Sequence, residues 1–251
     1  MSTPAASVAN DSPALSEGER ILCIFVAPAK TMADLRRKAN WLVPWLLMSI
    51  VSLSFVFAME KRIGWELIVR TQIERSASAE AFDRLSPAEQ QQRLDLDIRI
   101  TKYSSYLVPL LSVLWFALLA AALVAVFRFA VGAGITYGRT LAIVVYGSLP
   151  WLIERLLAVI TMCFADPEGF DLRNPIASGP SQWIDLAMGG EFSAHRFLYS
   201  VLNSFDLFTL WMVLLMAIGI SENAPVKRGT AFATIFGGFF LLKLVSAGLG
   251  F

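Results

Sequence analysis

The sequence predicts an all-α membrane protein, a polytopic helical bundle with five transmembrane helices. Of its 251 residues, 56% are hydrophobic, and the mean hydropathy is +0.60. A soluble domain of this length needs far fewer apolar residues, so the excess indicates that lipid surrounds much of the surface. The apolar residues also gather in runs that carry few charges and are long enough to cross a bilayer.

Charge and motif content exclude several classes of function. A net charge of +1 gives no general attraction to nucleic acid. No metal-binding His-Glu-x-x-His, Gly-x-Ser-x-Gly elbow, phosphate-binding loop or Cys-x-x-Cys occurs, and His195 is the only histidine. We therefore predict a protein that is not an enzyme and needs no cofactor or metal. The expected partners are the lipid bilayer and either a protein or a second copy of the chain.

Residues 1–15, rich in Ser, Ala, Pro and Asn, predict a disordered tail. Residues 16–40 predict two short helices. Ser16 starts the first with a capping box, Pro28 ends it, and Met32–Lys38 forms the second. The second helix ends in a basic cluster, which suggests either an element lying in the cytoplasmic headgroup layer or a simple positive-inside anchor. The cluster consists of Arg36, Arg37 and Lys38.

The first span is predicted at 41–59, with Trp41 anchoring its entry at the interface and Pro44 in its first turn. Acidic and basic residues interleave through 60–105, where we expect the first helix to continue beyond the lipid. Ser86 begins a second helix with a capping box, and this helix leads without a break into the second span. The segment predicts a helical hairpin outside the membrane, held by polar pairs and without a deep core.

The third span contains Pro150, which leaves a gap in the helical hydrogen-bond ladder. Residues 165–204 predict a partly irregular loop whose last part, 192–205, has amphipathic spacing. Gly237 and Gly238 in the fifth span are predicted to let helices approach closely. The second to fifth spans are predicted at 106–127, 140–164, 207–220 and 231–247, so that 41–251 forms one membrane domain.

Three charges fall inside the predicted spans, where an unpaired ion is costly. We expect Glu154 to pair with Lys243, because the two residues lie at similar depths in the third and fifth spans. Arg155 is expected to reach toward Asp206 or Asn203 at the outer end of the fourth span. This polar network favours either a structural role in the bundle or a path for a solute.

Five spans place the two ends of the chain on opposite sides of the membrane. The positive-inside rule favours a cytoplasmic amino terminus. Cys23 and Cys163 should then face opposite compartments, which excludes a disulfide bond within one chain. The basic residues that decide this orientation are Arg36, Arg37, Lys38, Arg128, Arg139, Lys227 and Arg228.

Three stretches resemble the Yip family, five-span membrane proteins named for interacting with Ypt/Rab GTPases. Phe25 to Met32 followed by Trp41-Leu42-Val43-Pro44 is similar to the entry motif of bacterial members, with Met32 in place of an aromatic residue. Tyr146-Gly147-Ser148-Leu149-Pro150 resembles the third-span segment, and Asp206 to Gly219 resembles the fourth span. The matching positions are Pro28, Trp41, Pro44, Tyr146, Gly147, Pro150, Asp206, Phe208, Trp211 and Gly219.

The resemblance implies a membrane scaffold that binds a partner, with a role in membrane organisation or trafficking and a location in a bacterial inner membrane. A fold alone does not transfer the binding of Rab GTPases to this chain. The alternative function is a permease for a small solute or ion that uses Glu154, Arg155 and Lys243.

Overall fold

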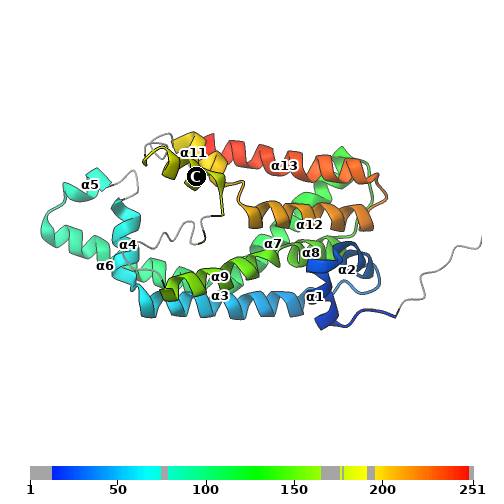
Figure 1. Cartoon of the computed structure of the whole chain (residues 1–251), viewed down its shortest axis with the longest axis horizontal. Coiled ribbons are helices and arrows are strands. Elements are labelled where there is room, and N and C mark those ends of the chain that lie inside the picture. The colour runs from blue at the N-terminus through cyan, green and yellow to red at the C-terminus, as the bar shows by residue number, and fades with distance from the viewer. Residues whose placement is uncertain (1–12, 75–78, 165–175, 177, 191–195, 249–251) are drawn as a thin grey trace, which may run out of the picture.

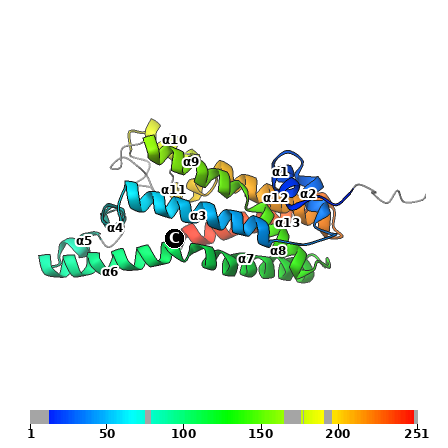
Figure 2. The ribbon, with the colours of Figure 1, turned by 90° about the horizontal axis from the view of Figure 1, so that it is seen from below.

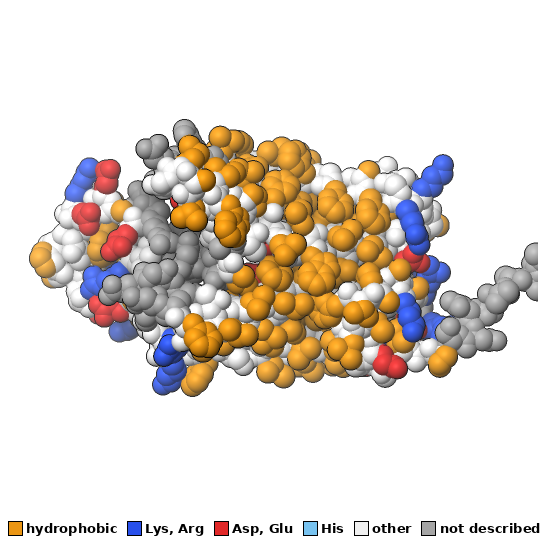
Figure 3. Space-filling model, in the orientation of Figure 1, with side chains coloured by type: hydrophobic (Ala, Val, Ile, Leu, Met, Phe, Trp, Pro, Cys, Tyr) orange, Lys and Arg blue, Asp and Glu red, His pale blue; other side chains and the backbone are white. Residues whose placement is uncertain are grey.

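A computed structural model of the chain describes residues 13–74, 79–164, 176, 178–190 and 196–248. Within these ranges every regular element is a helix, and the long helices lie side by side along one axis (Figure 1). This arrangement confirms the predicted class, an all-α polytopic bundle. Hydrophobic side chains cover the middle of the molecule and charged side chains gather toward its two ends (Figure 3).

Four stretches of helix are long and apolar enough to cross a membrane. They are α3 (Leu42–Arg62), α7 with the π-helix η1 (Val108–Ala125 and Val126–Ala130), α8 with α9 (Tyr137–Gly147 and Pro150–Phe164) and α13 (Arg228–Gly248). The fifth stretch is α12 (Leu207–Asn223), which follows α11 (Arg196–Asn203) across a bend of 57°. The described residues therefore contain four spans, or five if the bent pair is counted as one.

The third span is broken where the sequence predicts a gap. Helix α8 ends at Gly147, and α9 begins at Pro150, whose missing N–H cannot continue the helical ladder. The Ser148 hydroxyl donates a hydrogen bond of 2.8 Å to the Val144 carbonyl, which satisfies one acceptor at the break. The regular helix of the third span is therefore interrupted between Gly147 and Pro150.

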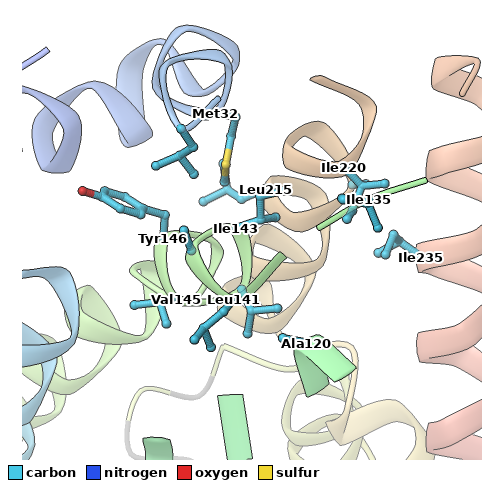
Figure 4. Packing of buried hydrophobic residues seen from close by; sticks show 14 of the residues in the cluster. Met32, Ala120, Ile135, Leu141, Ile143, Val145, Tyr146, Leu215, Ile220 and Ile235 are labelled. Carbon is cyan, nitrogen blue, oxygen red and sulfur yellow. The ribbon is translucent and has the colours of Figure 1, made fainter. Parts of the chain in front are cut away.

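Helix α8 lies at the centre of the main core. Its residues from Thr140 to Gly147 are all buried, because α7 and α12 pack against it and α1 and α3 also contact it. Figure 4 shows Met32 of α2 meeting Ile143 of α8 and Leu215 of α12 in this core. Helices α3 and α9 pack against each other beside it.

The first helix ends sooner than predicted, because it does not continue through the charged segment beyond the lipid. Helix α3 ends at Arg62, and Gly64 has a φ of +84°, a left-handed conformation that commonly terminates helices. The chain then turns into α4 (Trp65–Glu74), α5 (Ala79–Asp83) and α6 (Pro87–Tyr106). The predicted capping box at Ser86 is confirmed.

This outer segment also has a small apolar core, contrary to the prediction that polar pairs alone hold it. Trp65 and Ile68 of α4 and Leu94 of α6 are 8%, 2% and 1% exposed. A polar contact supports the same junction, since Lys102 Nζ lies 2.7 Å from Glu60 Oε1 at the end of α3. Burial of apolar side chains therefore fixes the fold of α4 and α6 against each other.

Candidate functional site

The amino-terminal hairpin consists of α1 (Glu17–Val26) and α2 (Pro28–Asp34). It packs against the end of the bundle where α12 finishes and α3 starts (Figures 1 and 2). The predicted capping box of Ser16 is confirmed. Hydrogen bonds from the backbone N–H of Ser16 and, to a lesser extent, from its side-chain hydroxyl lower the pKa of the Glu19 carboxyl. The predicted second helix at 32–38 was misplaced, because Pro28 has the backbone geometry of a first helical residue and starts α2 earlier.

A buried ion pair joins the two helices of the hairpin. Asp34 Oδ2 lies 2.8 Å from Arg20 Nε and 2.7 Å from Arg20 Nη2, and the two side chains are only 8% and 2% exposed. Burial alone would lower the pKa of Arg20, but the hydrogen bond and the charge of Asp34 outweigh it and raise the pKa. The Thr31 hydroxyl also donates a bond of 3.3 Å to the Arg20 carbonyl. The hairpin is therefore locked internally.

Glu17 ties the hairpin to the bundle. Its Oε2 accepts a hydrogen bond of 2.9 Å from the Tyr146 hydroxyl of α8, and its Oε1 accepts one of 2.9 Å from Asn40 Nδ2. Arg20 Nη1 lies 3.4 Å from the same Oε1. A carboxylate with several donors around it is well stabilised even when it is partly shielded from water. The arrangement gives Tyr146 a polar partner inside the core.

Met32 of α2 packs into the groove between α8 and α12. Its side chain is fully buried, and its carbonyl accepts a hydrogen bond of 2.8 Å from Asn223 Nδ2. A Cβ atom added to Gly219 would lie 2.8 Å from Met32 Sδ and 2.5 Å from Ile143 Cγ2. The absence of a side chain at Gly219 is therefore what lets α2, α8 and α12 meet at one point.

The outer face of α1 is apolar and uncovered. Leu22 and Val26 are 71% and 81% exposed. On the inner face, the Phe25 ring meets the Trp211 ring of α12 edge to face, with centroids 5.7 Å apart. Helix α1 therefore has one face buried against the bundle and one apolar face available for contact.

The predicted basic cluster lies directly after α2 and is exposed. Arg36 Nη2 lies 3.3 Å from Glu222 Oε2 at the end of α12, and Arg228 Nη2 of α13 lies 2.8 Å from Glu222 Oε1. Arg37 and Lys38 continue the exposed basic surface. One carboxylate of α12 therefore links the residues that follow α2 to the first residue of α13.

The remaining motif positions have structural roles. Trp41 precedes the first residue of α3 and meets the Trp45 ring edge to face, and Pro44 lies in the first turn, as predicted. Asp206 caps α12, since its Oδ1 accepts hydrogen bonds of 3.0 Å from the backbone N–H groups of Phe208 and Thr209. The residues of the three family motifs therefore start helices, cap a helix or let helices pack closely.

The predicted network of charges inside the membrane is arranged differently. No ion pair within 4.0 Å joins Glu154 to Lys243 among the described residues, so this pairing is corrected. Glu154 interacts electrostatically with Arg155 and with Asp206 of α12, because α9 packs on α12.

The two basic residues face aromatic rings. The Arg155 guanidinium lies 4.8 Å from the ring centroids of both Phe55 and Trp151. Lys243 Nζ lies 5.9 Å from the Phe239 ring centroid. Cation–π contacts therefore accommodate Arg155 and Lys243 in place of the expected ion pair. Asn203, which was an expected partner of Arg155, accepts a hydrogen bond of 3.1 Å at its Oδ1 from the Ser181 hydroxyl.

Sequence reasoning did not find the Arg20–Asp34 pair or the contacts of Glu17 and Asn223. A signal for the first was present, because Arg20 lies on the same helical face as Ile24, one turn away. Partners that lie on other elements could not be identified in this way. In the described part of the chain, no group of three His, Cys, Asp or Glu side chains is placed to hold a metal ion, and His195 lies outside the described residues.

The fold and this site define a class: a polytopic helical membrane protein whose amino-terminal hairpin is built into one end of its bundle. The family model of the Yip1 domain matches residues 22–247, and the chain belongs to that family. The match confirms the resemblance seen in the three motifs. No curated protein and no solved structure was found to match the chain at a significant level.

Proposed function

We propose that this chain is a non-enzymatic membrane scaffold that binds a protein partner through the outer face of its amino-terminal hairpin. The observation that carries the proposal is the pair Leu22 and Val26, 71% and 81% exposed on a helix that is itself held rigidly. A fixed apolar surface costs little conformational entropy when it binds. Membership of the Yip1-domain family supports the same function.

The location of the site follows from the charges around it. Arg36, Arg37, Lys38, Lys227 and Arg228 all lie at the hairpin end of the bundle and are exposed. By the positive-inside rule this end, with the amino terminus, lies in the cytoplasm. The resemblance to bacterial members of the family supports a bacterial inner membrane as the location. The partner would bind from the cytoplasm, close to the lipid headgroups.

The permease alternative has no observation in its favour. It depends on Glu154, Arg155 and Lys243 acting together, and Arg155 and Lys243 each face aromatic rings. We therefore propose the scaffold function alone.

The test compares partner capture by three forms of the full chain in mild detergent. A variant with Leu22→Asp and Val26→Asp should lose the partner that the unchanged protein retains. The matched control is Leu186→Asp, which changes a residue that is 76% exposed on α10 (Pro180–Ala187), at the other end of the molecule (Figure 2). Equal elution volumes would show that all three forms are folded.

Retention of the partner by the Leu22/Val26 variant would contradict the proposal. Equal loss in the Leu186 control would show that the capture depends on general hydrophobicity, and this result would also overturn it.

A further inference from the structure

One apolar face of α6 and α7 is covered by no other part of the chain that the structure describes. The two helices follow each other with only Leu107 between them, and hydrogen bonds of 3.0 Å from Leu107 N to Tyr103 O and from Leu111 N to Leu107 O carry the helical ladder across the junction. Figure 2 shows α6 and α7 as one nearly straight rod along an edge of the molecule. A rod of this kind can present one continuous face to a neighbour.

Large apolar side chains form a regular seam along this rod. Their spacing alternates between four and three residues, which places them on one face with the period of a coiled coil. Each is between 47% and 67% exposed. The seam consists of Leu96, Ile100, Tyr103, Leu107, Leu110 and Leu114.

The first part of the seam lies outside the membrane. Lys102 contacts Glu60, two residues before α3 ends, so the residues of α6 that precede Lys102 extend beyond the outer end of the first span. At a rise of about 1.5 Å per residue, Leu96 lies about 9 Å further out than Lys102. The hydrocarbon core of the bilayer therefore does not cover Leu96, and the exposure of this side chain to water is unfavourable.

The described helices of the chain do not pack against this face. Helix α6 packs on α4 through Leu94, which is 1% exposed. Residues two apart on a helix point about 200° from each other, so Leu96 faces away from that core. The seam is therefore free for another molecule.

We propose that the seam pairs with the same seam of a second copy of this chain, as two parallel helices that pass together from water into the bilayer. Lipid would cover only the part in the membrane, and a soluble partner would cover only the outer part. A second copy inserted in the same direction presents an identical seam at the same depth. The two copies are then related by a two-fold axis along the membrane normal.

Small residues continue the seam inside the bilayer. Ala117 and Ala121 follow Leu114 with the same alternation of three and four residues. Small side chains let helix backbones approach closely in lipid, where packing drives helix association. This inference goes beyond the proposed function and does not depend on it, because the hairpin lies at the opposite end of the bundle (Figure 2).

Cysteine cross-linking tests the pairing, because a seam residue lies next to its own symmetry mate in such a dimer. With Cys23 and Cys163 changed to Ser, Leu96→Cys should form a disulfide-linked species of twice 27.7 kDa in native membranes. Asp95→Cys is the matched control, exposed at the same depth but about 100° away around the helix. Equal cross-linking at both positions, or none at Leu96→Cys, would overturn the proposal.

A charge placed in the seam gives a second measurement. Light scattering in mild detergent should show a dimer for the unchanged protein and a shift to the monomer mass for Ile100→Asp. Gln91→Asp, exposed on α6 away from the seam, should stay dimeric. All three should keep the same helical content by circular dichroism, because the seam contributes nothing to the core of the single chain. A monomeric unchanged protein, or a dimeric Ile100→Asp, would contradict the inference.

Discussion

At the scale of single residues, two glycines decide how closely α8 and α12 pack. A Cβ atom on Gly147 would lie 2.7 Å from Met216 Cγ, and one on Gly219 would lie 2.5 Å from Ile143 Cγ2. Distances below 3.0 Å require something to move. Gly237 and Gly238, the glycines predicted to permit close approach, have no atom within 4 Å of such a position. The prediction was wrong because both glycines are exposed on α13, where no helix among the described residues packs on them.

Replacing Gly219 by Ala should therefore destabilise the protein. Overpacking of a full core costs about 1–3 kcal/mol. The free energy of unfolding in mild detergent measures the change. Gly237→Ala is the control, since it is also inside a helix, and it should be neutral or gain up to about 1 kcal/mol from its higher helix propensity. Equal stability of the two variants would show that the close contact at Gly219 relaxes without cost.

At the scale of elements, the amino-terminal hairpin behaves as part of the bundle. Its two helices have 10 and 7 residues, too short to be stable alone in water. Buried contacts stabilise them instead: the Arg20–Asp34 pair between the helices and the Glu17–Tyr146 bond to α8. A buried ion pair is sensitive to the loss of one partner, because the remaining charge stays buried without compensation.

Asp34→Ala should therefore cost about 3–5 kcal/mol of folding free energy, measured by equilibrium unfolding in detergent. Changing both partners, as Arg20→Leu with Asp34→Leu, should restore most of that loss, since no charge is then left buried. Glu66→Ala is the control: its pair with Arg70 has side chains that are 65% and 47% exposed, and such surface pairs contribute below about 1 kcal/mol. A double variant as unstable as Asp34→Ala would contradict this account.

At the scale of the whole molecule, apolar side chains surround the middle and charges lie at both ends (Figure 3). The hairpin lies at one end, and α9 finishes at the other, close to Cys163 (Figure 1). Three stretches long enough to span the membrane separate the two positions: α3, α7 with η1, and α8 with α9. An odd number of crossings puts the hairpin and Cys163 on opposite sides.

Labelling with a membrane-impermeant maleimide tests this topology. With Cys23 changed to Ala, Cys163, which is exposed, should react in cells with a permeable outer membrane. A chain that carries Gly18→Cys as its only cysteine should react only after the inner membrane is opened, because the amino terminus is predicted to be inside. Gly18 is a suitable position since it is exposed and has open space around it. Labelling of both from the same side would overturn the count of spans.

The sequence predicted what depends on near neighbours along the chain. Apolar runs gave the helical membrane class, the capping boxes at Ser16 and Ser86 gave the starts of α1 and α6, and Pro150 gave the break in the third span. These features follow from helix geometry and backbone hydrogen bonding within a few residues. The three motifs were likewise sufficient for the family, which the match over residues 22–247 confirms.

Only the tertiary structure decided which polar groups meet. Glu17 and Tyr146 are 129 residues apart and still form a hydrogen bond, and Asn223 contacts Met32 across 191 residues. Equal depth in the membrane suggested Glu154 and Lys243 as partners, but α9 packs on α3 and α12, and no ion pair joins the two residues in the described part of the chain. Depth along a helix can be read from the sequence, whereas the direction in which a side chain points depends on how the helices are rotated against each other.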